Sequence, residues 1–392
     1  MRGHFFLAWR YVMFHRWRTI ILLVCLTLTL FLPSSIHLLV TNFERSLWGR
    51  SEQTPMVVGA KGSRFDLVLH ALYFRARTPE LISVAELTEV RESGFGQAIP
   101  LYSMYRARGF PIVGTSLDYF DFRELRIRSG RLFIHLGECV LGAEIARALE
   151  LKVGDTIMSD PENVFNIAGE YPLKMQIVGI LEPAESVDDQ AVFVDTKTGW
   201  VISGIGHGHE DLSKTEDESA VLRREGKTIV ANASLMRYLE VTEKNRASFH
   251  FHAEPEERPL TALIVVPNDQ KASTLLRGRY QSAESRLQIL RPQEVVAEMM
   301  ATVGKVKQFL NLNFLIVAAV SGLFLALVVL LSLRLREKEI ETLYLLGCRR
   351  GTVIALVATE LAIVLVTSLG LGAVMMWLSR SAFELWLTRI FA

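Results

Sequence analysis

Three long apolar segments constrain this chain more than any other feature of its sequence. They cover residues 19–40, 312–333 and 353–378, and the last contains a single charged residue, Glu360. About 20 apolar residues in a helix are enough to cross a hydrocarbon core about 30 Å thick. The residues between the first and second segments contain no uncharged stretch of that length. The sequence therefore predicts three transmembrane helices, with a large block of residues between the first two.

Composition narrows the functional classes. Half of the 392 residues are apolar, and the formal net charge is only +1, so there is no overall basic field of the kind that nucleic-acid binders use. Three cysteines, an odd number, rule out a disulfide scaffold. Complete phosphate-loop, nucleophile-elbow and zinc-finger spacings are not found in the sequence. We therefore expect no enzymatic activity and no cofactor in this chain, apart from a metal considered below.

The Lys and Arg residues that flank the apolar segments predict the orientation. Four arginines and no acidic residue precede the first segment, and residues 334–352 between the second and third contain five Lys or Arg. Cytoplasmic loops of membrane proteins are enriched in these residues. The N-terminus and residues 334–352 are thus expected in the cytoplasm, and the large block outside. A cleaved signal peptide is the alternative, but no small-x-small cleavage site follows the first segment.

The predicted fold class is a membrane protein with three transmembrane α-helices and a large α+β extracytoplasmic domain between the first and second. Within this domain, alternating patterns indicate strands, and residues 199–219 read as a loop rich in Gly, His and acids. The expected segments are a cytoplasmic interfacial helix (1–18), the first span (19–41), the periplasmic domain (42–307), the second span (308–334), a cytoplasmic coupling loop (335–352), the third span (353–378) and a short outer tail (379–392). In the domain we expect strands at 65–74, 174–181, 191–194 and 261–266, helices at 78–93 and 143–150, and a helix from Pro292 into the second span.

Four of the nine histidines form two His-x-His pairs, His207/His209 and His250/His252. Residues i and i+2 of an extended chain share one face, so each pair can present two imidazoles to one cation. Zinc and similar divalent metals favour such nitrogen ligands, and acidic residues follow both pairs. The alternative is a solvated polar loop beside a half-exposed strand.

Three stretches of the sequence resemble a known family. REKEIETLYLLGCRRGTVIALVATELAIVL (336–365), the run from VGTSLDYF to KVGDTI (113–157) and MQIVGILEPAESVDDQAVFV (175–194) are similar to the macrolide-exporter, lipoprotein-release and FtsX type of ABC-transporter permease. The resemblance implies a MacB-like periplasmic core domain and an FtsX-like C-terminal region in the bacterial inner membrane. It also implies a permease subunit that couples ATP hydrolysis by a separate cytoplasmic ATPase to export, extraction or release of a substrate.

In that family the cytoplasmic loop carries a helix that docks on the ATPase. The resemblance places it at residues 343–354, with Leu343, Gly347, Arg349 and Arg350 at the contact. Gly347 is expected to end one helix and let the chain turn into the next. The expected partners are this ATPase, a second copy or a related permease, a periplasmic binding or adaptor protein, and membrane lipids, but not nucleic acid. Glu360, an acid inside the third span, is expected to contact Arg334 or a partner helix, since intramembrane acids are costly unless paired.

One departure from the family keeps a second function open. The family normally has four spans, whereas only 14 residues follow Leu378 here, too few to cross. The alternative function is therefore a membrane-anchored periplasmic metal-binding sensor or scaffold without transport activity.

Overall fold

The computed structural model describes residues 2–75, 79–161, 172–208, 221–225, 228–231, 239–280, 285–335, 337–345 and 347–391. The chain divides into two compact units. The first comprises Met1–Arg45 and Met300–Arg389, and the second comprises Ser46–Met299 and Ile390–Ala392. Each unit is described below by itself.

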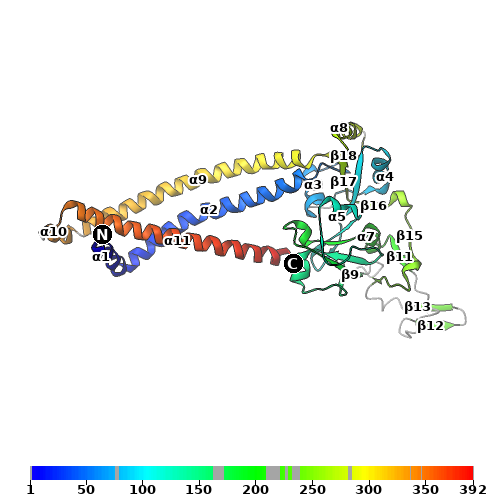
Figure 1. Ribbon diagram of the computed structural model, residues 1–392, viewed down its shortest axis with the longest axis horizontal. Helices are drawn as coiled ribbons and strands as arrows, with labels where there is room; N and C mark the ends of the chain where they lie inside the picture. Colours follow the sequence, from blue (N-terminus) through cyan, green and yellow to red (C-terminus); the bar gives the residue numbers. More distant parts are fainter. Residues whose placement is uncertain are drawn as a thin grey trace. The chain divides into compact units, whose positions relative to one another are not determined.

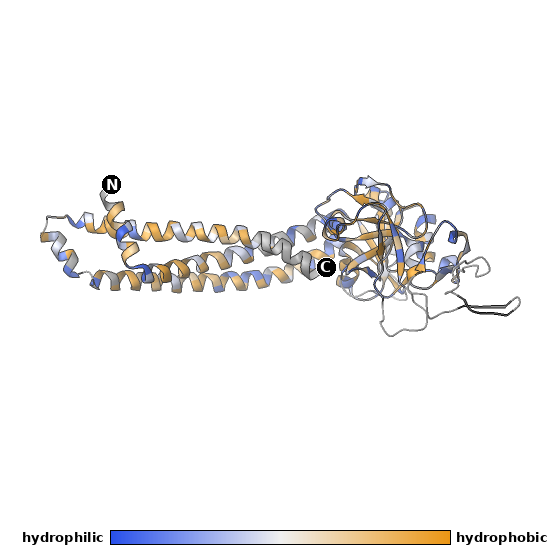
Figure 2. Cartoon of the chain, turned by 90° about the horizontal axis from the view of Figure 1, so that it is seen from below, coloured by the Kyte–Doolittle hydropathy of each residue, from blue (hydrophilic) through white to orange (hydrophobic). Residues whose placement is uncertain are grey.

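Long helices make up the first unit. Its elements are α1 (Arg2–Phe14), the N-terminal part of α2 (Arg16–Glu52), most of α9 (Pro292–Leu335), α10 (Glu337–Leu345) and α11 (Arg350–Phe391). Apolar residues dominate the middle of α2, α9 and α11, which run alongside one another in this unit (Figures 1 and 2). The hydroxyls of Thr29 on α2 and Ser321 on α9 lie 3.0 Å apart. Within the described residues, three stretches are long and apolar enough to cross a membrane, Arg16–Leu38, Pro292–Leu331 and Arg350–Ser379, which confirms the three predicted spans.

The end of the chain differs from the expected tail. Residues 379–391 continue α11 without interruption, so the helix runs from Arg350 to Phe391 rather than ending near Leu378. Neither glycine nor proline occurs after Gly372 to stop it. At the other end of the chain, α1 and α2 are separate helices, with a turn at His15 between them.

A mixed sheet of 12 strands forms the centre of the second unit (Figure 1). Its main path runs β14-β9-β7-β10-β5-β3-β17-β1-β18, with β4 on β5, and β6 and β8 on β9. The pairs β10–β5, β7–β9 and β14–β9 are parallel, and the other pairs are antiparallel. The strands are β1 (Met56–Ala60), β3 (Gly96–Tyr102), β4 (Arg106–Ala107), β5 (Phe110–Thr115), β6 (Ile127–Gly130), β7 (Glu138–Leu141), β8 (Thr156–Met158), β9 (Leu173–Leu181), β10 (Val192–Asp195), β14 (Leu239–Glu240), β17 (Ala262–Pro267) and β18 (Leu287–Leu290).

The central strands of the sheet, such as β1 and β10, are buried on both faces and are almost continuously apolar. On β10, Val192 and Val194 join one core cluster, while Phe193 between them packs on the rings of Phe74 and Phe120. Successive side chains of a strand point to opposite faces, so such a run requires cover on both sides. Cys139 on β7 is fully buried in the same core, as a small apolar residue.

Helices and three small two-stranded sheets complete the second unit. The helices are α3 (Arg64–Tyr73), α4 (Val84–Glu92), α5 (Asp118–Phe122), α6 (Ala143–Ala148), α7 (Thr196–Ile202), α8 (Gln270–Arg279), and the short 3-10 turns η1 (Val187–Gln190), η4 (Arg246–Ser248) and η5 (Pro255–Glu257). The small sheets pair β2 (Ile82–Ser83) with β16 (Pro259–Leu260), β11 (Gly206–Gly208) with β15 (Phe249–Phe251), and β12 (Val221–Glu225) with β13 (Thr228–Ala231).

Three sequence predictions for this unit are wrong. Residues 65–74, expected as a strand, form α3, because Ser63 caps the helix by accepting from the Asp66 amide at 3.2 Å and Leu67, Val68, Ala71 and Leu72 share a buried side. The helix expected at 78–93 begins only at Val84, since Ile82 and Ser83 pair with β16. Residues 199–202 belong to a helix capped by Asp195, not to a loop.

Candidate functional site

A buried ion pair secures the last turn of α2 within the second unit. The two side chains of Arg50 and Asp188 are 8% and 2% exposed, and Nη1 of Arg50 lies 2.6 Å from Oδ2 of Asp188. Nη2 of Arg50 donates to the other carboxylate oxygen at 2.9 Å and to the Tyr119 hydroxyl at 2.8 Å, and that hydroxyl donates to Asp188 at 2.7 Å. Three segments distant in the sequence thus meet in one closed network, called here the Arg50 network.

Burial and pairing act against each other in the Arg50 network. Burial by itself would raise the pKa of Asp188, but the charge of Arg50 and hydrogen bonds from Arg50 and Tyr119 outweigh it and hold that pKa below its usual value. Burial would likewise lower the pKa of Arg50, yet Tyr119 and Asp188 raise it above the ordinary arginine value. Burial raises the pKa of Tyr119. The pair is therefore charged, and the tyrosine neutral, at every physiological pH.

Further contacts join the same end of α2 to the domain. The Arg50 Nε donates to the carbonyl of Leu72 at the end of α3, and the Tyr73 hydroxyl donates to the carbonyl of Leu47 at 2.9 Å. Thr54 donates to the Arg50 carbonyl and accepts from Nη2 of Arg123. The Arg50 and Leu72 carbonyls lie in the last turns of α2 and α3, where carbonyls have no partner within the helix, so these contacts satisfy part of both helix ends.

A second polar cluster lies at the surface of the same unit, on the small sheet of β11 and β15. His207 on β11 is the direct cross-strand partner of His250 on β15, and His252 follows two residues later. One ring nitrogen of each of His207, His250 and His252 lies within 4.8 Å of the others, and the Nε2 atoms of His207 and His252 are 3.3 Å apart. We call these three residues the histidine cluster.

The histidine cluster combines the two His-x-His pairs differently from the sequence expectation. His250 and His252 do share a face, but their third neighbour comes from the other strand, so the cluster crosses both predicted pairs. His209 lies outside the described residues. Glu254 and Glu256 lie beyond β15, and the residues grouped as possible metal ligands in the described part of the chain are the three histidines.

The structure between the second and third spans differs from the expected coupling helix. Residues 343–354 are not one helix: α10 ends at Leu345, Gly347 has a φ of +86°, and α11 begins at Arg350. A positive φ favours glycine because it has no Cβ, which is why the chain turns here. Leu343 thus lies on α10, Arg349 in the turn and Arg350 on the first residue of α11. Gly347 ends one helix before the next, as the sequence predicts.

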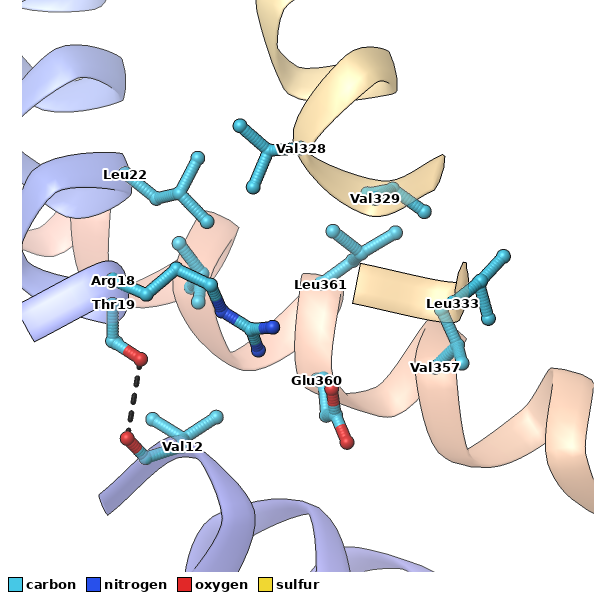
Figure 3. A pocket seen from close by; sticks show the side chains of 11 residues that line it. Val12, Arg18, Thr19, Leu22, Val328, Val329, Leu333, Val357, Glu360 and Leu361 are labelled. Atoms are coloured by element: carbon cyan, nitrogen blue, oxygen red, sulfur yellow. Dashed lines mark hydrogen bonds between the residues drawn. The ribbon is translucent and has the colours of Figure 1, made fainter. Parts of the chain in front are cut away.

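Glu360 is buried within the first unit and lines a cavity of about 40 Å³ between α1, α2, α9 and α11. The remaining lining is mostly apolar, and the lining residue with a positive charge is Arg18 of α2, whose guanidinium extends into the same space (Figure 3). Arg334, one of the two partners expected from the sequence, is not among the lining residues. An acid and a base in one apolar cavity compensate part of each other's cost of leaving water.

Two family models match the sequence. The MacB-like periplasmic core domain matches residues 37–234, and the FtsX-like permease C-terminal model matches residues 311–391. The chain belongs to the MacB/FtsX-like family of ABC-transporter permeases. It is therefore a membrane-embedded component of an ABC transporter, and its family is not one of hydrolases.

Two solved structures are similar to the chain at low identity. The periplasmic region of MacB from Actinobacillus actinomycetemcomitans is 11% identical, with 63% of this chain and 92% of that one covered and a TM-score of 0.35. The extracellular domain of the noncanonic ABC-type transporter YknZ from Gram-positive bacteria is 10% identical, with 60% and 98% covered and a TM-score of 0.33. Curated protein sequences give no match.

The family matches cover the two clusters differently. All members of the Arg50 network lie inside the region that matches the MacB-like domain. Of the histidine cluster, His207 lies in that region, whereas His250 and His252 lie in neither matched region. Sequence reasoning missed the Arg50 network altogether. Its residues are 69 and 138 positions apart, so only the fold brings them together, although an arginine in the last turn of a long helix was a signal that could have been followed.

Proposed function

We propose that this permease couples ATP hydrolysis by a separate cytoplasmic ATPase to movement of its large domain on the outer side of the bacterial inner membrane. The continuity of α2 carries the proposal: one helix contains the first span and ends in the Arg50 network of the domain. Pro33 interrupts the hydrogen bonds of α2 inside the span, but residues 34–52 contain no further proline. A helix is held by its own hydrogen bonds and rises about 1.5 Å per residue, so a shift at the membrane end of this stretch is transmitted to whatever holds its other end.

The second connection has the same construction. Helix α9 begins at Pro292, with Val295 and Val296 buried in the domain, and continues through the second span. Glu298 of α9 pairs with Arg64 at 3.2 Å and Glu294 with Arg277 at 3.8 Å. Both chain connections of the domain are thus helical and fastened by side chains, which suits transmission of movement better than a flexible tether does.

We place the ATPase contact on α10 and the turn that follows it. The five Lys and Arg residues of 334–352 support a cytoplasmic position, and Gly347 gives the turn its shape. Arg349 and Arg350 are exposed there and can pair with acidic side chains of the ATPase. A second permease copy, or a related permease, completes the transporter, and a periplasmic adaptor or binding protein supplies or takes up the substrate.

Isolation of the tagged permease from its native membranes tests the proposed partnership. We expect an ABC ATPase to co-purify in stoichiometric amount and to be reduced at least about tenfold by Arg349→Glu/Arg350→Glu, because two charges reverse at the contact. The matched control is Lys152→Glu/Lys197→Glu, two exposed lysines of the domain that reverse the same charge elsewhere. Equal ATPase recovery with both double variants would overturn the contact, and absence of any ATPase would overturn the proposed function.

The histidine cluster favours one second candidate, a membrane-anchored metal-binding sensor or scaffold. Three converging imidazoles are not needed for a mechanical domain. If this candidate is right, the tagged protein binds metal and no ATPase co-purifies with it from the membrane. The two functions are distinguished by the same purification, since the sensor alone would bind metal without an ATP-hydrolysing partner.

A further inference from the structure

The ribbon formed by β11 and β15 has one apolar face and one imidazole face. Phe249 and Phe251 alternate with His250 and His252 along the second strand, so the two residue types point to opposite sides. Phe249 and Phe251 pack against the domain core, and the Phe251 ring lies edge-on to Trp200 with the centroids 6.2 Å apart. The guanidinium of Arg258 covers the same Phe251 ring at 4.8 Å. The apolar face of the ribbon therefore packs against the domain, and the imidazole face is on the opposite side.

The glycines on either side of His207 allow the phenylalanine rings of β15 to pack over β11. A Cβ at Gly206 would lie 2.5 Å from the Phe251 ring, and a Cβ at Gly208 would lie 2.6 Å from the Phe249 ring. Only glycine leaves room for the two rings to cross the partner strand. The two glycines thus leave space for the phenylalanine rings on the inner face. His207 is the residue of β11 whose side chain lies on the outer face.

The three imidazoles lie close together on that outer face. Their ring centroids are 4.7 Å apart for His207 and His250, 4.6 Å for His207 and His252, and 4.8 Å for His250 and His252. The Nε2 atoms of His207 and His252 are separated by 3.3 Å. A tetrahedral metal with nitrogen ligands at about 2.0–2.1 Å has ligand–ligand edges of about 3.3 Å, so this pair already has the spacing of two ligands.

A backbone contact favours the metal-binding tautomer of the third imidazole, His250. Nδ1 of His250 lies 3.3 Å from the carbonyl oxygen of Ser248, to which it donates when it carries the proton. Donation from Nδ1 places the lone pair on Nε2, the usual arrangement for a histidine that binds a metal. A carbonyl oxygen cannot donate, so this contact favours the tautomer that a metal requires.

We propose that His207, His250 and His252 form a binding site for one borderline divalent transition-metal ion, of which Zn²⁺ is the probe. Three neutral nitrogens suit such ions, whereas Ca²⁺ and Mg²⁺ require oxygen ligands. Three protein ligands leave a coordination position for water or another ligand. The metal would also join β11 to β15, two paired strands that are far apart in the sequence. This site does not depend on the ATPase, so its test and that of the proposed function fail separately.

Zinc binding to the full-length chain, purified without metal in detergent micelles, tests the site. We expect one Zn²⁺ per wild-type chain in a calorimetric titration and a loss of at least about tenfold in affinity for each of His207→Ala, His250→Ala and His252→Ala. His135→Ala is the control, because His135 is an exposed histidine of the same domain outside the cluster. Equal zinc uptake by wild type and the triple variant would overturn the site and leave a hydrogen-bonded histidine trio only.

A spectroscopic measurement on the wild type guards against misfolding of the variants. Co²⁺ bound in place of Zn²⁺ should give the intense visible bands of a four- or five-coordinate nitrogen site, and equimolar Zn²⁺ should abolish them. The His135→Ala protein should give the same bands. A Co²⁺ spectrum equal to that of the hydrated ion at saturating protein would overturn the proposal without use of any cluster variant.

Discussion

The Arg50 network and the histidine cluster both bring distant polar residues together on one domain, and they do so in opposite ways. In the Arg50 network a cation, an anion and a hydroxyl satisfy one another out of contact with water. In the histidine cluster three identical side chains meet at the surface, and His250 is exposed. Opposite charges satisfy one another within the protein, whereas three converging imidazoles provide the nitrogen donor set of a metal site. The first arrangement therefore serves the fold, and the second suits binding.

The largest effect should come from removing the cation of the Arg50 network. Arg50→Met leaves Asp188 buried without its partner, and loss of one member of a buried ion pair costs about 3–5 kcal/mol. We expect the free energy of unfolding of the domain to fall by that amount. Denaturant titration of the full-length chain in micelles, followed by tryptophan fluorescence, measures it.

The double variant Arg50→Met/Asp188→Leu is the control for this effect. It removes both charges together, so its cost should be smaller than the sum of the two single variants by at least about 1 kcal/mol. A loss below about 1 kcal/mol for Arg50→Met alone would show that α2 is not fastened to the domain by this residue, and would also weaken the proposed transmission of movement.

A lone histidine provides the next test, because within the described residues its imidazole has neither an opposite charge that shifts its pKa nor a place in a histidine cluster. His70 is buried on α3, its Nε2 has no hydrogen-bond partner among the described residues, and burial lowers its pKa from 6.5 to about 4. The unfolded chain therefore binds a proton below pH 6.5 that the folded domain does not bind. Stability should fall as the pH falls from 6.5 to 4.5, by about 2 kcal/mol for this group.

The variant His70→Leu isolates the contribution of this histidine to the pH dependence of stability. It removes the titrating group and keeps an apolar side chain of similar size. Its stability should depend less on pH than that of the wild type between pH 6.5 and 4.5. Glu138 titrates below this window, since hydrogen bonds from Arg131 and from the Ile134 and His135 amides overcome burial and lower its pKa to about 2. Identical pH profiles for the two proteins would contradict the burial argument for His70.

The sequence predicts best where hydrophobicity alone decides the structure. The three spans and strands β9, β10 and β17 are such runs, and they were found. Residues 65–74 were assigned wrongly because FDLVLHALYF fits both a strand and an amphipathic helix. The Ser63 cap on the Asp66 amide decides between them, so a helix start signal outweighs a short apolar alternation.

The sites were predictable only in part, because pairing between distant segments is set by register. The i, i+2 spacing revealed that His250 and His252 share a face, but only the pairing of β11 with β15 shows that His207 joins them. Gly347 was correctly expected to end a helix, whereas the helix boundaries around it were placed too late. Local backbone chemistry was readable at that glycine, and its three-dimensional context was not.

The smallest effect should come from the histidine cluster in the absence of metal. His250→Ala removes an exposed side chain whose cluster neighbours are other histidines, and surface substitutions of this kind change the free energy of unfolding by no more than about 0.5 kcal/mol. The same denaturant titration, with chelator present, measures it beside Arg50→Met. A loss above about 1 kcal/mol without metal would mean that the imidazoles hold the ribbon together by themselves. Metal affinity would then be a secondary property of a structural cluster, and the contrast with the Arg50 network would not hold.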